Sequence, residues 1–232
     1  MAGIAQNEER PNSLRAFRKP GSEAKVAQDD ATGIRGETVL VPVLPLPDVC
    51  LFPESSLGLV VKRSHSVRAV GMAARAGGRL LAVAQRDPSS PNAPIRDLHA
   101  VGTIALIAED TALSDGARRV ELDGIRRART VTLLGTEMLV AEVDLLDEGD
   151  AGDEWGGAVE ALARYLHTHP DLRSFIDQQR RSQEPMSWVN LACQHLPITS
   201  TARQKLLDAD ARERCLKISR GLDALLRKEQ AS

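Results

Sequence analysis

The sequence predicts an α+β protein in which a region rich in strands precedes a region of helices. Two observations support this prediction. From Thr38 to about residue 150, short apolar runs alternate with turn residues, whereas after residue 150 apolar residues recur three and four positions apart. An acidic stretch that contains glycine, residues 149–153, separates the two patterns. We therefore expect a disordered tail over 1–37, a β-domain over 38–150 and a helical domain over 151–232.

The β-domain opens on an apolar run, TVLVPVLPLP, that begins at Thr38 and predicts a buried strand. Pro42, Pro45 and Pro47 have no N–H to donate to a neighbouring strand. Because proline is confined mainly to sheet edges and bulges, we expect this strand at an edge of the sheet or at the seam of a barrel. An open edge would be a place where another polypeptide could add as a strand.

A short helix and a series of strands follow. The helix begins at Ser64 and ends at the glycines 77–78, and the apolar run GRLLAVAQRD after it predicts a strand. From Val101 onward, three strand-like runs are separated by turn sequences at 114–116 and 134–136. This arrangement predicts a meander of hairpins.

The helical domain begins with a helix whose apolar residues share one face: Trp155, Val159, Leu162 and Leu166. His169-Pro170 ends this helix, and residues 172–176 carry the apolar spacing of a second one. Ser187 is positioned to cap a third helix, and the hydroxyl residues at 199–201 offer a cap for a fourth. The last segment is the longest, with apolar residues at helical spacing: Ala211, Cys215, Ile218, Leu222 and Leu225.

Composition excludes several classes of function. The chain has 232 residues with 42% hydrophobic and 27% charged side chains, as in ordinary soluble globular proteins. A net charge of -2 and only 3% aromatic residues argue against binding of nucleic acid. The first residues have no apolar signal region, and no apolar stretch is long enough to span a membrane, so we expect a cytoplasmic protein. The three cysteines form no CxxC pair and are expected to be reduced and buried: Cys50, Cys193 and Cys215.

The motifs of common catalytic chemistries are missing from the sequence. A phosphate-binding loop of the GxxxxGK[ST] type needs a Gly-Lys pair, and the chain contains none. No serine lies in a GxSxG sequence, which excludes the nucleophile elbow of α/β-hydrolases. The five histidines are scattered without an HExxH or cysteine-rich partner: His65, His99, His167, His169 and His195. We therefore expect no enzyme activity, and no catalytic, cofactor-binding or metal-binding residues.

Three other features could carry chemistry, and each has a simpler interpretation. Cys193 and His195 combine a thiol with a base, but residues two apart on a helix point away from each other. A basic stretch could contact phosphates: Arg118, Arg119, Arg126, Arg127 and Arg129. Because these arginines alternate with apolar residues, we interpret the stretch as the solvated face of a strand. Trp155 and Trp188 are spaced with leucines and are expected in the core.

Five short motifs follow one another along the chain. The opening Leu-Pro-Leu-Pro-Asp at 44–48 precedes Leu-Phe-Pro at 51–53, and Val-Ala-Gln-Arg-Asp follows at 83–87. Further along, Val-Gly-Thr occupies 101–103, and Leu-Asp-Gly-Ile-Arg-Arg-Ala-Arg occupies 122–129. The order and spacing of these motifs resemble those of the amino-terminal domain of Lon proteases, and the resemblance runs from about residue 39 to 229.

The resemblance implies a PUA-like β pseudo-barrel with a short helix, followed by an all-α helical bundle. Two positions depart from the family pattern. Pro47 stands where the family usually has Arg, and Leu-Gly-Leu-Val-Val at 57–61 stands where it usually has Pro-Leu-Phe-Val. The 232 residues do not include the ATPase and Ser-Lys peptidase modules of full Lon proteases, so we do not expect the activity of those modules here.

The resemblance implies a stand-alone, non-catalytic module that recognises unfolded or exposed polypeptide segments, with a Lon-type protease and a second copy of the chain as further candidate partners. The residues that bind substrate are not identified by the sequence. One alternative is the amino-terminal part, or a partner subunit, of an ATP-dependent Lon-type serine peptidase. A further alternative is a PUA-like RNA-binding protein, suggested by the fold and by the arginines at 118–129.

Overall fold

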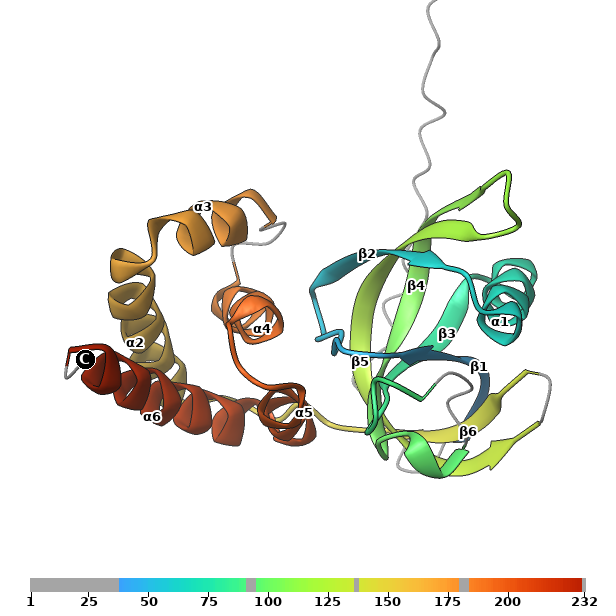
Figure 1. Ribbon diagram of the computed structural model, residues 1–232. Coiled ribbons are helices and arrows are strands. Elements are labelled where there is room, and N and C mark those ends of the chain that lie inside the picture. Colours follow the sequence, from blue (N-terminus) through green and yellow to red (C-terminus); the bar gives the residue numbers. More distant parts are fainter. Residues whose placement is uncertain (1–37, 91–94, 136–137, 180–183, 231–232) are drawn as a thin grey trace, which may run out of the picture. The chain divides into compact units, whose positions relative to one another are not determined.

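The computed structural model describes residues 38–90, 95–135, 138–179 and 184–230. The predicted tail over 1–37 lies outside these residues. Residues 36–232 form one compact unit, in which all the strands precede the helices α2–α6 (Figure 1). The α+β class predicted from the sequence is therefore confirmed.

Six strands form one mixed sheet: β1 (Thr38–Leu46), β2 (Ser56–Val61), β3 (Arg79–Ala84), β4 (Val101–Ala112), β5 (Arg118–Leu134) and β6 (Val140–Leu145). Their order is β2-β5-β4-β3-β1-β6, and an additional pairing of β5 with β6 closes the last five into a ring. The helix α1 (Ser64–Arg75) packs on β1 and β3 and ends before two glycines with positive φ, as predicted. The predicted hairpins β4–β5 and β5–β6 are both present.

The first strand lies at the seam of this ring, which is one of the two positions expected for it, and not at a sheet edge. Residues Thr38 to Pro42 pair with β6, and residues Val43 to Leu46 pair with β3 in parallel. Because the strand changes its partner at Pro42, each half forms a ladder mainly on one side. The missing N–H groups of its prolines are therefore tolerated in a strand that has neighbours on both sides.

Two irregularities in β5 change which side chains face the core. The registers with β4 and β6 shift around Ile125 and Val131, and each shift inserts an extra residue into β5. Ile125 is 47% exposed and Val131 is 55% exposed, although both were expected on the buried face of a regularly alternating strand. The sequence shows the alternation but not the bulges that reverse it.

Five helices follow the sheet: α2 (Glu154–Thr168), α3 (Pro170–Gln179), α4 (Pro185–His195), α5 (Ser200–Asp208) and α6 (Ala211–Gln230). Thr199 caps α5 as predicted, since its side chain accepts a hydrogen bond from the Ala202 N–H at 3.2 Å. The expected capping role of Ser187 is wrong. The helix α4 begins two residues earlier, at Pro185, whose fixed φ suits the first helical position.

The buried apolar residues form three clusters. Two of them lie within the strand-rich part, one centred on Val41 and Val143 and one on Leu80 and Leu122. The third joins the helices, but it also contains four residues from the strand-rich part: Cys50, Phe52, Ala84 and Val101. The strands end at Leu145 and the helices begin at Glu154, and the division into two domains at 150/151 stays a prediction.

Candidate functional site

A polar face of α4 holds the loop that leads into β2. Ser187 Oγ donates to the Glu54 carbonyl oxygen at 3.3 Å, and Asn190 Nδ2 donates to the Pro53 carbonyl oxygen at 3.1 Å. Ser187 and Asn190 lie three positions apart on one side of the helix, and both are buried. They satisfy backbone carbonyls that would otherwise be buried without partners, so the loop at 52–56 has a fixed position.

Gln194 continues the same face of α4 and makes two bonds to the same loop. Its Oε1 accepts from the Phe52 N–H at 3.2 Å, and its Nε2 donates to the Ser56 carbonyl oxygen at 2.8 Å. Ser56 is the first residue of β2, so the carbonyl oxygen at the start of this strand already accepts a hydrogen bond from a side chain of α4. The sequence signal for this face is the set of polar residues at 187, 190 and 194 in a helix otherwise rich in apolar residues, whereas the expectation for α4 rested on its apolar face alone.

The strand β2 lies at the end of the sheet order and has an open edge. Among the residues that the structure describes, it pairs only with β5. The Gly124 N–H donates to the Ser55 carbonyl oxygen at 2.8 Å, and the Gly124 carbonyl oxygen accepts from the Glu54 N–H at 2.8 Å, so Glu54 and Ser55 form a bulge opposite Gly124 at the start of the ladder. In an antiparallel ladder hydrogen-bonded pairs alternate with non-bonded ones, so the backbone groups of Gly58 and Val60 point away from β5. The Ser56 carbonyl, which is directed to Gln194, has the same orientation.

The side chains along β2 are small or apolar. Gly58 and Val60 are exposed, and Val60 retains 45% of its accessible surface. Leu57 and Leu59 are partly buried and pack against the core beneath the strand. A Cβ added at Gly58 would have no heavy atom within 4 Å, so the space above this residue is open. The edge therefore combines unpaired backbone groups with exposed apolar surface.

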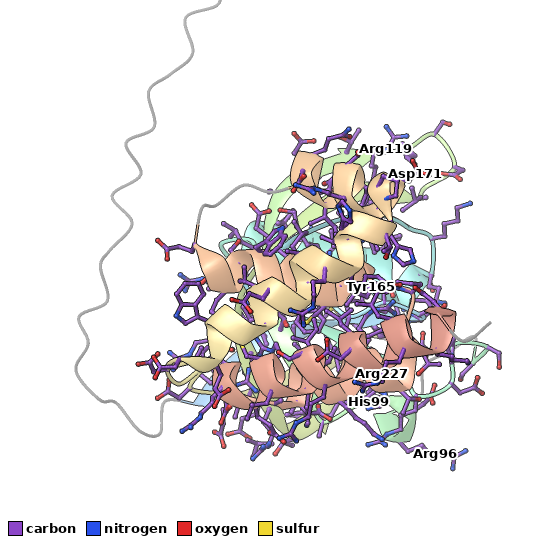
Figure 2. All side chains as sticks on the ribbon, turned by 90° about the vertical axis from the view of Figure 1, so that its left-hand side faces the viewer. Arg96, His99, Arg119, Tyr165, Asp171 and Arg227 are labelled. Atoms are coloured by element: carbon purple, nitrogen blue, oxygen red, sulfur yellow. The ribbon has the colours of Figure 1, made fainter. Side chains whose placement is uncertain are left out.

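Charged residues of opposite sign lie at the two ends of β2. Glu54 precedes the strand and is exposed, with a positive φ of 59°. Lys62 follows the strand and is exposed, and Arg119, which is paired with Val60 in the register, is also exposed (Figure 2). The open edge is thus bordered by an acidic residue at its beginning and by basic residues at its end.

The predicted arginine stretch does not form a common surface. Arg118 is paired with Asp110, its Nε donating to Oδ1 at 2.7 Å, and Arg126 donates to the Leu146 carbonyl oxygen at 2.8 Å. Arg119, Arg126 and Arg129 are exposed, as expected for a solvated strand face. The five arginines therefore do not form one phosphate-binding patch.

Arg127 is buried, so the expectation of a solvated side chain is wrong at this position. Only 3% of its side chain is exposed, and its Nε donates to Glu148 Oε1 at 2.7 Å. Its two Nη atoms donate to three backbone carbonyl oxygens, those of Asp147, Leu207 and Asp208. The bulge next to Ile125 turns Arg127 toward the helices, where it binds the segment after β6 and the end of α5.

Cys193 and His195 do not form a nucleophile and base pair. Cys193 is buried in the core of the helices, and burial raises the pKa of its thiol to about 12. His195 instead makes an edge-on contact with the Phe175 ring, with 4.9 Å between ring centroids. All three cysteines are free and buried, as predicted.

The two tryptophan side chains differ in how far they are buried. Trp188 is partly buried and packs against the core, as predicted. Trp155 is 44% exposed, so its expected burial is wrong. It lies in the first turn of α2, whereas Leu162, Tyr165 and Leu166 further along α2 are buried.

Three further apolar side chains of the ring are exposed: Leu40 at 64%, Val131 at 55% and Leu134 at 54%. Leu40 lies on β1, and Val131 and Leu134 lie on β5, with β6 between these two strands. In the part of the chain that the structure describes, no group of three His, Cys, Asp or Glu residues could hold a metal ion, and no helix is long and apolar enough to cross a membrane.

Comparison with known proteins agrees with the motifs in the sequence. The family model of the ATP-dependent protease La (LON) substrate-binding domain matches residues 40–223. Lon protease 1 of Thermus thermophilus is 32% identical over 196 residues, which are 81% of this chain and 24% of that protein. The Lon protease of Escherichia coli K12 is 27% identical over 188 residues, 78% of this chain and 24% of that protein. The chain thus spans about a quarter of the length of these curated relatives.

The fold is similar to that of solved structures. The N-terminal domain of the Mycobacterium avium complex Lon protease has a TM-score of 0.64 and 21% identity, covering 80% of this chain and 98% of that one. A Lon N-terminal domain protein from Xanthomonas campestris has a TM-score of 0.53 and 20% identity, covering 77% and 95%. On the family match over most of its length, this chain belongs to the family of Lon substrate-binding domains.

Proposed function

We propose that this chain binds exposed segments of unfolded polypeptides without catalysing a reaction on them. The observation that carries the proposal is its membership of a family of substrate-binding domains. The open edge of β2 supports it, because unpaired backbone groups can bind a polypeptide with little regard to its sequence. The exposed apolar side chains on the ring, such as Leu40, offer additional surface for apolar segments.

The absence of catalysis is part of the same proposal. The thiols of Cys50 and Cys193 both have their pKa raised to about 12 by burial, which keeps them protonated and unreactive at neutral pH. His195, the base nearest to Cys193 in sequence, is in contact with Phe175 and not with a nucleophile. These features support a binding role for the described residues.

A second candidate is cooperation with an ATP-dependent Lon-type serine peptidase, either as its amino-terminal part or as a partner subunit. It is favoured by the alignment with only about a quarter of the length of Lon proteases. Retention of a Lon-type protease from cytosol on the immobilised chain would support it. RNA binding is not favoured, because Arg127 is buried and Arg118 is paired with Asp110.

The test compares how the chain binds one ligand protein, lactalbumin, in its unfolded and folded forms. Reduced, carboxymethylated lactalbumin serves as the unfolded ligand, and native lactalbumin serves as the matched folded control. Fluorescence anisotropy should show binding of the unfolded form with a Kd on the order of micromolar, and no binding of the native form. Equal binding of both forms, or none of either, would contradict the proposal, and a salt-sensitive affinity for RNA would favour the RNA-binding alternative.

A further inference from the structure

We propose that the open edge of β2 takes one extended segment of the bound polypeptide as an additional strand, hydrogen-bonded to the backbone of Gly58 and Val60. The inference rests on the proposed function, because it names the place and the manner in which the polypeptide binds. Its ligand is a short apolar segment in the extended conformation, with an acidic residue at the end that lies beside Lys62.

The backbone geometry supplies the hydrogen-bonding groups. The Ser55 carbonyl oxygen accepts from the Gly124 N–H and therefore points to β5, so the alternate residues Leu57 and Leu59 also direct their backbone groups to β5. Gly58 and Val60 direct theirs to the opposite side, where no strand of the described chain pairs with them. An incoming strand would meet an N–H and a C=O from each of these two residues.

From Gly58 to Val61 the edge carries no proline, charged side chain or bulge, which are three of the usual protections against strand addition. Natural edge strands are commonly blocked by proline, by charged side chains or by bulges. The sequence of β2 is Ser-Leu-Gly-Leu-Val-Val, without proline or charge, and its register with β5 is regular from Ser56 to Val61. An unprotected edge of this kind is expected where a strand is meant to bind.

The surroundings define the segment that fits. The open space above Gly58 can accept a large side chain, and an aromatic residue on an added strand packs well across an edge glycine. Lys62 and Arg119 lie at the Val61 end of the edge, and Glu54 lies at the other. The charge complementarity favours a segment with an acidic residue beside Lys62 and Arg119 and a basic residue beside Glu54.

Gln194 limits the length of the pairing. Its Nε2 already donates to the Ser56 carbonyl oxygen, so the added strand cannot extend its hydrogen bonds from Gly58 toward the start of β2. The interaction is therefore short, and its affinity depends on the few backbone bonds at Gly58 and Val60. Removing backbone N–H groups from the ligand should therefore weaken its binding.

The main experiment uses the wild-type chain and a short apolar peptide with an acidic residue at one end. The peptide is prepared unmodified and in two N-methylated forms, each methylated at alternate residues. Only one set of alternate N–H groups can face β2, so one form should lose at least about tenfold in affinity while the other stays close to the unmodified peptide. Equal affinities of the two methylated forms, whether retained or lost, would overturn the inference.

Hydrogen exchange gives an independent measurement on the protein. In the free chain the amides of Gly58 and Val60 should exchange fast, and those of Leu57 and Leu59 slowly, because β5 protects the second pair. Saturation with the peptide should slow exchange at Gly58 and Val60. Binding without any slowing there would overturn the inference while leaving the proposed function intact, whereas no binding of any unfolded ligand would contradict both.

Two variants of Val60 distinguish the contribution of its backbone N–H to binding from that of its side chain. Val60→Pro removes an N–H that faces the open edge and leaves the ladder to β5 intact, since edge strands tolerate proline on the solvent side. Val60→Ala keeps the N–H and shortens the side chain. We expect Val60→Pro to weaken peptide binding by about tenfold, the effect of losing roughly one hydrogen bond, and Val60→Ala to weaken it much less. A Val60→Pro variant that folds and binds normally would overturn the inference.

Discussion

Arg214 Nη2 donates to Glu148 Oε2 at 3.0 Å, and this ion pair joins the last helix to the segment that follows the sheet. The Arg214 side chain is fully buried, and the same carboxylate also accepts from Arg127. Arg214 further donates to Asn190 Oδ1 at 2.6 Å and lies over the Phe52 ring, 5.6 Å from its centroid. One guanidinium group therefore connects α6, α4 and the loop that leads into β2.

Removal of Arg214 should destabilise the chain strongly. Loss of the buried guanidinium leaves the carbonyl oxygens of Leu206 and Ala209 without their donor, and breaking a buried ion pair by deleting one partner costs about 3–5 kcal/mol. We expect Arg214→Ala to lower the free energy of unfolding by this amount in urea denaturation. Arg164→Ala is the control, because the Arg164–Asp223 pair is exposed and should contribute less than about 1 kcal/mol. Similar losses for the two variants would contradict this assignment.

Gly124 should not tolerate a side chain. A Cβ at this position would lie 2.1 Å from the Phe52 carbonyl oxygen, a backbone atom that is fixed by its loop. Gly124→Ala should therefore cost about 1–3 kcal/mol or more in unfolding free energy. Gly58→Ala is the matched variant in the paired strand, where a Cβ meets nothing within 4 Å, and its cost should stay within about 0.5 kcal/mol. Thermal unfolding followed by circular dichroism would measure both.

The three thiols should be unreactive in the folded chain. Burial raises the pKa of Cys50 and Cys193 to about 12 and also raises that of Cys215. Since the thiolate is the reacting species, a disulfide reagent such as dithionitrobenzoate should react slowly with the native protein at pH 8 and rapidly after denaturation. Fast reaction of any thiol under native conditions would show that its burial is incomplete.

The stability of the chain should fall in mild acid. Burial is the main cause that lowers the pKa of His65, His99 and His195 below the ordinary 6.5, and neighbouring arginines lower it further. Their contribution is complete above pH 6.5 and is lost as the pH falls toward the folded-state values, because the unfolded chain takes up protons first. The urea midpoint should therefore decrease between pH 7.5 and 5.5.

A histidine variant assigns part of this effect. His195→Gln should show a smaller decrease in the urea midpoint than the wild-type chain over the same pH range. The comparison is made between the two proteins because the pKa of Glu54, raised by burial and by neighbouring carboxylates, acts in the opposite sense. An identical decrease in both proteins would exclude His195 as a source of the acid sensitivity.

Local patterns predicted most of the elements, and the motifs of the family proved to hold the fold together. Gly124 has no side chain and so allows β5 to approach the Phe52 backbone closely. Thr103 Oγ1 donates to the Leu51 carbonyl oxygen at 2.6 Å. Gln85 is buried and accepts from Arg63 Nη1 at 2.7 Å. These residues are recognisable in the sequence because backbone contact and burial restrict them to a few types.

The candidate site was not predictable in the same way. Whether β2 is an edge depends on the pairing of strands far apart in the sequence, and the run Ser-Leu-Gly-Leu-Val-Val carries no signal of its position. The prolines of β1 indicated an edge or a barrel seam, and the change of partner along the strand accommodates them at the seam. The burial of Arg127 depends on a bulge that alternation alone does not reveal.

The closure of the ring has a consequence for the kinetics of folding. Thr38 pairs with Asp144, so the first and last strands meet across most of the strand-rich sequence. Contacts of such large sequence separation carry a high cost of loop closure and slow the folding reaction. Until β6 has been synthesised, half of β1 has no partner, and a nascent chain would expose an apolar strand that aggregates readily. We expect the β1–β6 ladder to form late, after the β4–β5 hairpin, whose contacts are local.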